Sequence, residues 1–268
     1  MNLESFEVGF NIPAKVGMDV DEIQTPSLII DYKIFENNLI KMKEFVLNNN
    51  VKLRPHAKMH KSVDVAKYQI DNGGAHGICC QKLSEAEIFV RAGIKDILIT
   101  NQITDEFKLE RLAKIASKVS KIGCCVDNKE NIINIQEAAQ RNNSQIDIYI
   151  EYDCGANRCG IKSFNEINEL IETIKKMANL NFIGFQAYNG SIQHIEDHKI
   201  RQKKVKNTCK KIRELKTNFI KYSPFITGVG TGCFDLEVNE EVYDEIQVGS
   251  YAFMAVSYTH LTLPTILS

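Results

Sequence analysis

Short apolar segments rich in β-branched residues alternate with longer segments of helical spacing along most of the chain. Runs of about four to eight such residues predict buried strands, and apolar positions three and four apart predict amphipathic helices. The pattern predicts a first strand over 26–31 (PSLIID) and a helix over 32–49, with Ile34, Leu39, Met42 and Phe45 on one face. Eight further strands are predicted at 51–56, 75–80, 95–100, 120–127, 145–153, 181–188, 223–230 and 245–250.

Segments of helical spacing, such as 84–93, 107–118 and 164–180, lie between these eight strands. The link before the last strand is shorter and acidic, and no long helix is expected there. Strands that alternate with helices pair in parallel, because each helix returns the chain to the same end of the sheet. Eight such units favour an α/β fold of the closed (β/α)8 type, a TIM barrel, which commonly needs roughly 250 residues. An open doubly wound sheet is the alternative.

Composition and charge exclude several classes of protein. The 268 residues are 44% hydrophobic and 25% charged, and 33 basic against 34 acidic residues leave no basic excess for nucleic acid or an anionic membrane. No apolar run reaches the roughly 18 residues of a spanning helix, and Met1–Phe10 lacks the features of a signal peptide. Eight cysteines include the pairs Cys79–Cys80 and Cys124–Cys125 but no CxxC. We therefore expect reduced, buried thiols and a cytoplasmic protein.

A barrel indicates where chemistry should be found, because catalytic groups lie at the carboxyl ends of its strands. Polar and glycine-rich positions follow five of the predicted strands. They are His56, Lys58, Arg158, Tyr188, Gln193, His194, 228–232 and 249–251.

Lys58 is the first candidate for covalent chemistry. It follows the first barrel strand, and crowding by Arg54, Lys61 and histidines should favour the neutral amine that forms a Schiff base. The alternative is a surface lysine in a basic loop. His56 and His60 lie four apart, but the glutamate of an HExxH zinc motif is missing, so no metal site is expected there.

The glycine run GVGTG at 228–232 follows the seventh strand, where barrels often hold phosphate. Glycines allow close approach of the backbone to an anion, and Thr231 adds a hydroxyl donor. A simple tight turn is the alternative. The run fits neither the dinucleotide fingerprint nor a Walker loop. A lysine, a phosphate cradle, an arginine and two tyrosines at one barrel mouth are the groups that pyridoxal 5′-phosphate requires.

Seven blocks in order resemble one enzyme family: TPSLIID, LRPHAKMHK, GICCQKLSEAE, CGANRCGI, GFQAYNGSIQH, TGVGTG and EIQVGSYAFM. They are similar to the D-threonine aldolase and D-serine dehydratase family, fold type III pyridoxal-phosphate enzymes related to the N-terminal barrel of alanine racemase. The resemblance covers about Thr25–Met254 and implies that Lys58 is the Schiff-base lysine. It also implies cofactor contacts from His56, Arg158, Tyr188, Gly230, Thr231, Gly232 and Tyr251.

Within this family, TGVGTG and EIQVGSYAFM look more like the aldolase branch. The resemblance then implies cleavage of D-β-hydroxy-α-amino acids to glycine and an aldehyde, with a divalent metal (Mn, Mg or Zn) and a homodimer at full length. His194 is the candidate that assists the base at the β-hydroxyl, although a histidine capping the next helix is the alternative. Two other functions remain open: a dehydratase acting on D-serine or D-3-hydroxyaspartate, and a pyridoxal-phosphate carrier. A barrel without catalytic function is a third possibility.

The ends of the chain depart from the family. We expect an N-terminal extension over 1–24 and the cofactor-binding barrel over 25–255, with 26–31 forming a strand of a C-terminal β domain that is largely missing. Residues 256–268 contain VSYTHLTLPT, which resembles a translated sequencing adapter. The family's metal-binding His and Asp lie in the missing domain. We therefore expect a weakly stable, inactive fragment in which 26–31 is exposed.

Overall fold

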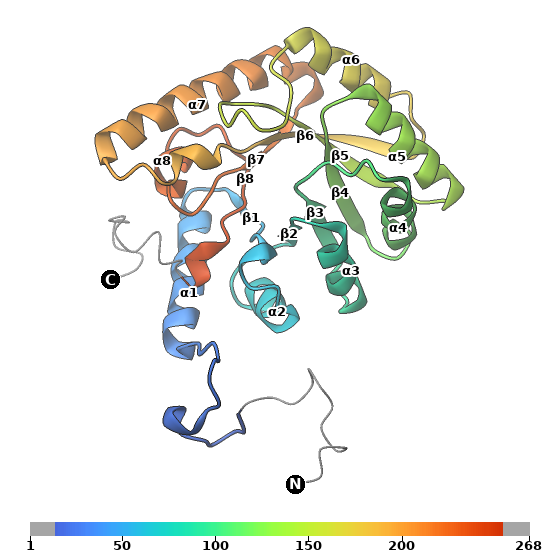
Figure 1. The fold of residues 1–268 in the computed structure, drawn as a ribbon. Coiled ribbons are helices and arrows are strands. Elements are labelled where there is room, and N and C mark those ends of the chain that lie inside the picture. Colours follow the sequence, from blue (N-terminus) through green and yellow to red (C-terminus); the bar gives the residue numbers. More distant parts are fainter. Residues whose placement is uncertain (1–13, 254–268) are drawn as a thin grey trace.

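Eight parallel strands form the central sheet of the computed structural model, which describes residues 14–253 (Figure 1). Seven strands lie within the segments that the hydrophobic pattern predicts and β6 begins one residue before its segment, so the eight predictions are confirmed. The strands are β1 Lys52–Leu53, β2 Ile78–Cys80, β3 Asp96–Ile99, β4 Lys121–Val126, β5 Ile146–Glu151, β6 Leu180–Ala187, β7 Phe225–Gly228 and β8 Glu245–Ile246.

The sheet curls until its two edge strands meet. Its order is β1-β8-β7-β6-β5-β4-β3-β2, and all neighbouring pairs are parallel. A parallel bridge between His56 and Cys79 joins the β1 and β2 edges, and the Cys79 N–H donates to the Pro55 carbonyl at 2.8 Å. The expected barrel is therefore present, and all strand carboxyl ends lie at one mouth.

Helices surround this sheet (Figure 1). They are α1 Tyr32–Asn48, α2 Val63–Asp71, α3 Leu83–Arg91, α4 Glu106–Ala116, α5 Lys129–Arg141, α6 Phe164–Ile174, α7 His198–Asn218 and α8 Phe234–Val238. The short α8 confirms that no long helix links β7 to β8. Within residues 14–253, none of the helices combines the length and the apolar character that a membrane crossing requires.

The adjacent cysteines show how the strands divide the core. Cys79 and Cys125 pack with Leu98 and Tyr149 inside the barrel, whereas their neighbours Cys80 and Cys124 belong to the cluster between sheet and helices. Successive strand residues point to opposite faces, so each pair serves both layers. Burial raises the pKa of Cys124 to about 12. The prediction that the paired cysteines are reduced and buried is therefore confirmed.

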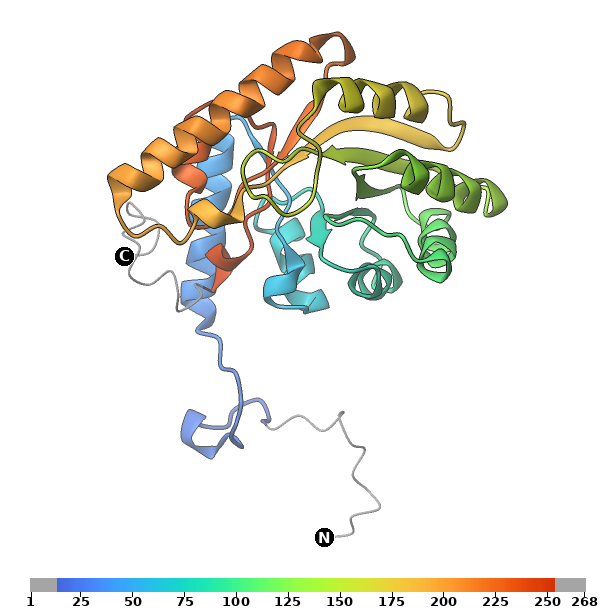
Figure 2. The ribbon, with the colours of Figure 1, turned by 45° about the horizontal axis from the view of Figure 1, so that its top comes forward.

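The segment before α1 is not the strand that the sequence predicts, but it is exposed as expected. Pro26–Asp31 forms no strand within the described residues, and Leu28, Ile29 and Ile30 are exposed, with Leu28 at 101%. Figure 2 shows this segment leading away from the barrel. The predicted apolar face of α1 is wrong at Ile34, which is exposed, while Phe35 one position later packs against Phe253 with ring centroids 5.1 Å apart.

Polar substitution of the exposed segment should leave the barrel intact. Changing Leu28→Ser, Ile29→Thr and Ile30→Thr together removes apolar surface that contacts little, so we expect the free energy of unfolding to change by no more than about 0.5 kcal/mol. Urea unfolding and soluble yield would measure the result, with increased yield expected. Leu39→Ala on the buried face of α1 is the contrast, with a loss of about 2–5 kcal/mol. A comparable loss in the triple variant would show that 28–30 packs against the barrel.

Candidate functional site

The carboxyl ends of the strands enclose a cavity of about 400 Å³. Its walls come from loops that follow at least five different strands, as the sequence predicts. The lining residues are His56, Lys58, Met59, Gln81, Thr100, Arg158, Gln186, Tyr188, Gln193, His194, Gly230, Thr231, Gln247, Gly249 and Ser250.

A single 3₁₀ turn directly after β1 places Lys58 at this cavity. Ala57 is buried beneath the turn Ala57–Met59, and the Lys58 side chain remains accessible. Burial by the surrounding walls and the nearby Arg158 charge lower the pKa of the Lys58 ammonium. This favours the neutral amine that attacks a carbonyl carbon.

The expected cause of this shift needs correction. Arg54 is not among the groups that lower the pKa, because its guanidinium bonds Glu245 and Asp96, which line a separate pocket with Arg54. Lys61 lies outside the cavity, with its ammonium 3.6 Å from Glu85. Arg158, which comes from the loop after β5, is the charge that acts on Lys58.

His56 is held as a neutral donor in the cavity wall. Burial, followed by the charges of Lys58, His60 and Arg158, lowers its pKa to about 3. Its Nδ1 accepts from the Lys58 backbone N–H at 3.4 Å, so the remaining proton lies on Nε2 and is directed at Thr100 Oγ1, 3.0 Å away. A neutral imidazole here avoids a second positive charge beside Lys58.

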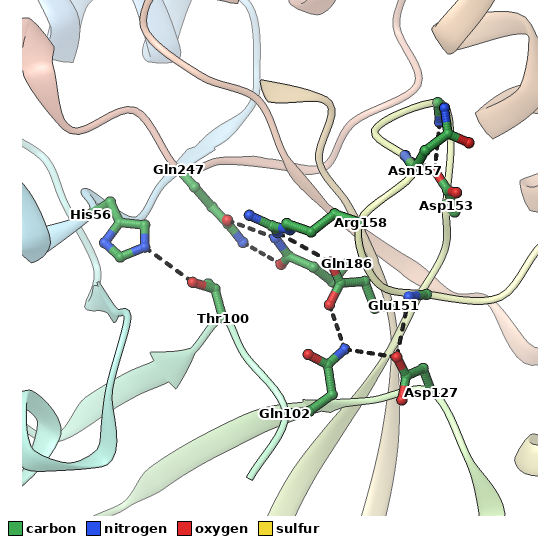
Figure 3. A network of polar contacts seen from close by, with 12 residues as sticks. His56, Thr100, Gln102, Asp127, Glu151, Asp153, Asn157, Arg158, Gln186 and Gln247 are labelled. Atoms are coloured by element: carbon green, nitrogen blue, oxygen red, sulfur yellow. Dashed lines mark hydrogen bonds and ion pairs between the residues drawn. The ribbon is translucent and has the colours of Figure 1, made fainter. Parts of the chain in front are cut away.

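Arg158 is anchored from two sides, and Figure 3 shows its contact with Glu151. Its Nη2 lies 3.2 Å from Glu151 Oε1, and its guanidinium lies over the Tyr188 ring, 5.7 Å from the centroid. Gln102 Nε2 donates to the other Glu151 oxygen at 2.6 Å and to Asp127 at 3.3 Å. Because Glu151 is buried and held by Gln102, it fixes the direction in which Arg158 presents its positive charge.

The glycine run after β7 has the properties of an anion cradle. Thr231 Oγ1 is buried and has no hydrogen-bond partner among the described residues, so its hydroxyl can serve a ligand. A Cβ on Gly230 would lie 2.1 Å from Gln193 Oε1, so any other residue here would displace the Gln193 amide. That same amide oxygen accepts from the Gly232 N–H at 3.2 Å. These groups fit the phosphate of a cofactor.

Two buried amides that the sequence analysis did not single out form part of the cavity wall. Gln186 on β6 and Gln247 just after β8 exchange hydrogen bonds of 3.0 and 2.7 Å, and Gln247 Nε2 also donates to Thr227 Oγ1 (Figure 3). Each glutamine lies within an otherwise apolar strand segment, and this feature of the sequence could have identified both. A buried amide needs a hydrogen-bond partner, so a glutamine in such a segment indicates a polar contact inside the fold.

The remaining candidates divide into two groups. His194 lines the cavity, and Asp197 rather than His194 caps α7 by accepting from the Ile200 N–H. Gly232 and Tyr251 are absent from the lining. Tyr251 is buried in the 3₁₀ turn Ser250–Ala252, where its hydroxyl accepts from Gln69 Nε2 at 3.1 Å.

Residues 14–253 contain no group of three or more His, Cys, Asp or Glu side chains that could hold a metal ion. The described part of the chain therefore does not by itself provide a metal centre.

Comparison with known proteins identifies relatives over nearly the whole chain. The chain is 41% identical over 261 residues to 3-hydroxy-D-aspartate aldolase from Paracoccus denitrificans (strain Pd 1222). This match covers 96% of the chain and 67% of the relative. The chain is 38% identical to D-threonine aldolase from an Arthrobacter species over 92% of this chain and 65% of that protein. The crystal structure of D-threonine aldolase from Filomicrobium marinum superposes with a TM-score of 0.91 at 36% identity, over 94% of this chain and 69% of that one.

Relatives named as dehydratases are more distant. D-serine dehydratase from Dictyostelium discoideum is 26% identical over 64% of this chain. The chain spans about two thirds of the length of its aldolase relatives. The model of the alanine racemase N-terminal domain matches residues 30–257, and the chain therefore belongs to the alanine racemase N-terminal domain family.

Proposed function

We propose that this chain is the barrel of a pyridoxal-phosphate-dependent lyase that cleaves D-β-hydroxy-α-amino acids to glycine and an aldehyde. Family membership implies pyridoxal phosphate. The observation that carries the proposal is Lys58, an accessible lysine with a lowered pKa that shares one cavity with Arg158 and the Thr231 cradle. The aldolase branch is favoured because the aldolases are more similar to this chain than the dehydratases are.

Each residue of the cavity has a separate task in this proposal. Lys58 holds the cofactor, and the backbone and hydroxyl of Gly230 and Thr231 bind its phosphate. Arg158 presents a fixed positive charge, and neutral His56 donates within the wall without adding charge. Bound pyridoxal phosphate supplies an electron sink for the negative charge that develops at Cα. His194, at the cavity edge, assists in removing the proton of the substrate β-hydroxyl.

Several parts of the proposal reach beyond residues 14–253. A divalent metal would need ligands from outside this range. We propose that the chain has an N-terminal extension over 1–24, the barrel over 25–255 and a tail over 256–268. The tail lies outside the described residues. Leu28–Ile30 is exposed, and we propose that the 268 residues bind the cofactor without turnover. The homodimer and the cytoplasmic location stay predictions.

The reaction products test the proposed branch. The gene extended at its 3′ end to its natural sequence, given Mn²⁺ and D-threonine or 3-hydroxy-D-aspartate, should release glycine and an aldehyde in equal amounts. Chromatography of amino acids and an alcohol-dehydrogenase-coupled assay would measure both. Ammonia with a keto acid would establish the dehydratase alternative, and equal rates with the L-isomers would contradict the assigned configuration. The chain of 268 residues, assayed in parallel, should give neither set of products.

A further inference from the structure

A buried glutamate lies directly behind the glycine run. Glu237 on α8 is 1% exposed. Its carboxylate accepts from Cys233 Sγ at 2.9 Å and from the Tyr243 hydroxyl at 3.2 Å, and the Gly230 backbone also bonds it. Three donors from the loop and from the segment before β8 therefore converge on one carboxylate.

Among the described residues, no cation is one of the groups that act most strongly on this carboxylate. The titratable groups around it are Cys233 and Asp235 near α8, Tyr243 before β8, Cys154 after β5 and Cys209 on α7. Burial, with a small contribution from Asp235, outweighs the three hydrogen bonds and raises the pKa of Glu237 to about 7. A buried acid without a cation exchanges its proton near neutral pH for this reason.

The surrounding hydrogen bonds suit the protonated form. Tyr243 has one hydroxyl proton but two acceptors within reach, Glu237 Oε1 and the Ala187 carbonyl at 3.1 Å. When Glu237 carries a proton, it can donate to the tyrosine oxygen, and the tyrosine proton is then available for Ala187. Ala187 ends β6, and the next residue, Tyr188, lines the cavity.

Glu237 and the cavity lie on opposite sides of one short loop. The Gly230 backbone bonds Glu237, and the next residue, Thr231, lines the cavity and has a buried hydroxyl without a hydrogen-bond partner among the described residues. The start of this loop packs closely against the end of β6, because a Cβ on Gly228 would lie 2.2 Å from the Ala187 carbonyl oxygen. A phosphate bound by Thr231 is thus separated from Glu237 by little more than backbone.

We propose that Glu237 is a positioning residue that holds the phosphate-binding loop and takes up a proton when a phosphate ester binds; this rests on the proposed function. Two negative groups on either side of a buried loop repel each other, so a bound phosphate favours the protonated carboxyl. By linkage, protonated Glu237 favours phosphate binding, and affinity falls as Glu237 ionises with rising pH.

The test uses 4′-deoxypyridoxine 5′-phosphate, which has no aldehyde and so reports binding without the Lys58 reaction. Its dissociation constant is measured by equilibrium dialysis between about pH 6 and pH 8.5 for the full chain and for Glu237→Gln. We expect similar affinities at the acidic end and about tenfold tighter binding by Glu237→Gln at the alkaline end, which corresponds to a carboxyl pKa shift of about one unit. The ionisation of the probe itself is common to both proteins.

Calorimetric titration in two buffers of different ionisation enthalpy then counts protons directly. Wild type should take up more protons than Glu237→Gln at about pH 7.5. Glu240→Gln is the matched control, because it removes the same charge from the surface beside Arg213 and should behave as wild type. Parallel pH profiles for wild type and Glu237→Gln, or weaker binding by Glu237→Gln at all pH values, would overturn the inference. Failure of wild type to bind the probe at any pH would instead refute the proposed function and, with it, the inference.

Discussion

Replacing Lys58 by alanine should abolish covalent capture of pyridoxal phosphate. The amine nitrogen that attacks the cofactor aldehyde is then absent, and Lys61 and Lys82 do not line the cavity. Lys58→Arg should give the same result, because a guanidinium remains protonated and cannot make the bond. Borohydride reduction of the wild type followed by peptide mapping should place the pyridoxyl group on Lys58, and the extended gene carrying Lys58→Ala should show no measurable turnover.

Two controls make this result specific. Lys61→Ala removes an accessible lysine three positions away, whose ammonium lies 3.6 Å from the buried Glu85, and should capture the cofactor as wild type does. The phosphate probe without an aldehyde should bind Lys58→Ala with little loss, since Thr231 and the glycine run are unchanged. Recovery of the pyridoxyl group on Lys61 or Lys82 in the wild type would overturn the assignment of Lys58.

The hydrophobic pattern was sufficient to locate the eight barrel strands because both layers of the core are filled by their side chains. Ile97, Ile122 and Ile148 pack under the helices, while Leu98 and Tyr149 pack inside. A strand buried on both faces appears in the sequence as a continuous apolar run. The same criterion failed at Pro26–Asp31, because an apolar run becomes a strand only where a second strand completes its hydrogen bonds.

The composition of the site was harder to predict than its position. Arg54 and Lys58 are close in sequence, but the chain advances about 3.3 Å per residue along a strand, so Arg54 reaches a deeper part of the barrel. Its partner Glu245 lies 191 residues away, and Gln186 and Gln247 are 61 residues apart. Such pairings depend on strand register, which the local pattern does not contain. The surroundings of Tyr251 depend on a similarly distant partner, because Gln69 comes from α2.

Glu245 connects the interior of the barrel to the cavity. It is fully buried, and its carboxylate accepts from Arg54 Nε at 2.9 Å and from Thr227 Oγ1 at 2.6 Å. Thr227 in turn accepts from Gln247 Nε2, which lines the cavity. Burial alone would raise the pKa of Glu245, but Arg54 and His76 lower it below its ordinary value. The ionised form is therefore the one that the folded barrel stabilises.

Glu245→Gln should lower the free energy of unfolding by about 3 kcal/mol, near the lower end of the cost of breaking a buried ion pair, because Asp96 still contacts Arg54. Urea unfolding at neutral pH measures the loss, and Glu87→Gln, which breaks the more exposed pair with Arg111, should cost less than about 1 kcal/mol.

The lowered pKa of Glu245 also predicts a pH dependence. The greater stability of wild type over Glu245→Gln exists above the ordinary pKa of 4.5 and disappears as the pH falls through the lower pKa of Glu245 in the folded protein. Equal losses in the two variants, or a difference that persists in strong acid, would show that the Glu245 charge does not stabilise the barrel. A loss confined to Glu245→Gln, with weaker binding of the phosphate probe, would show that the buried pair also holds the amides at the cavity in place.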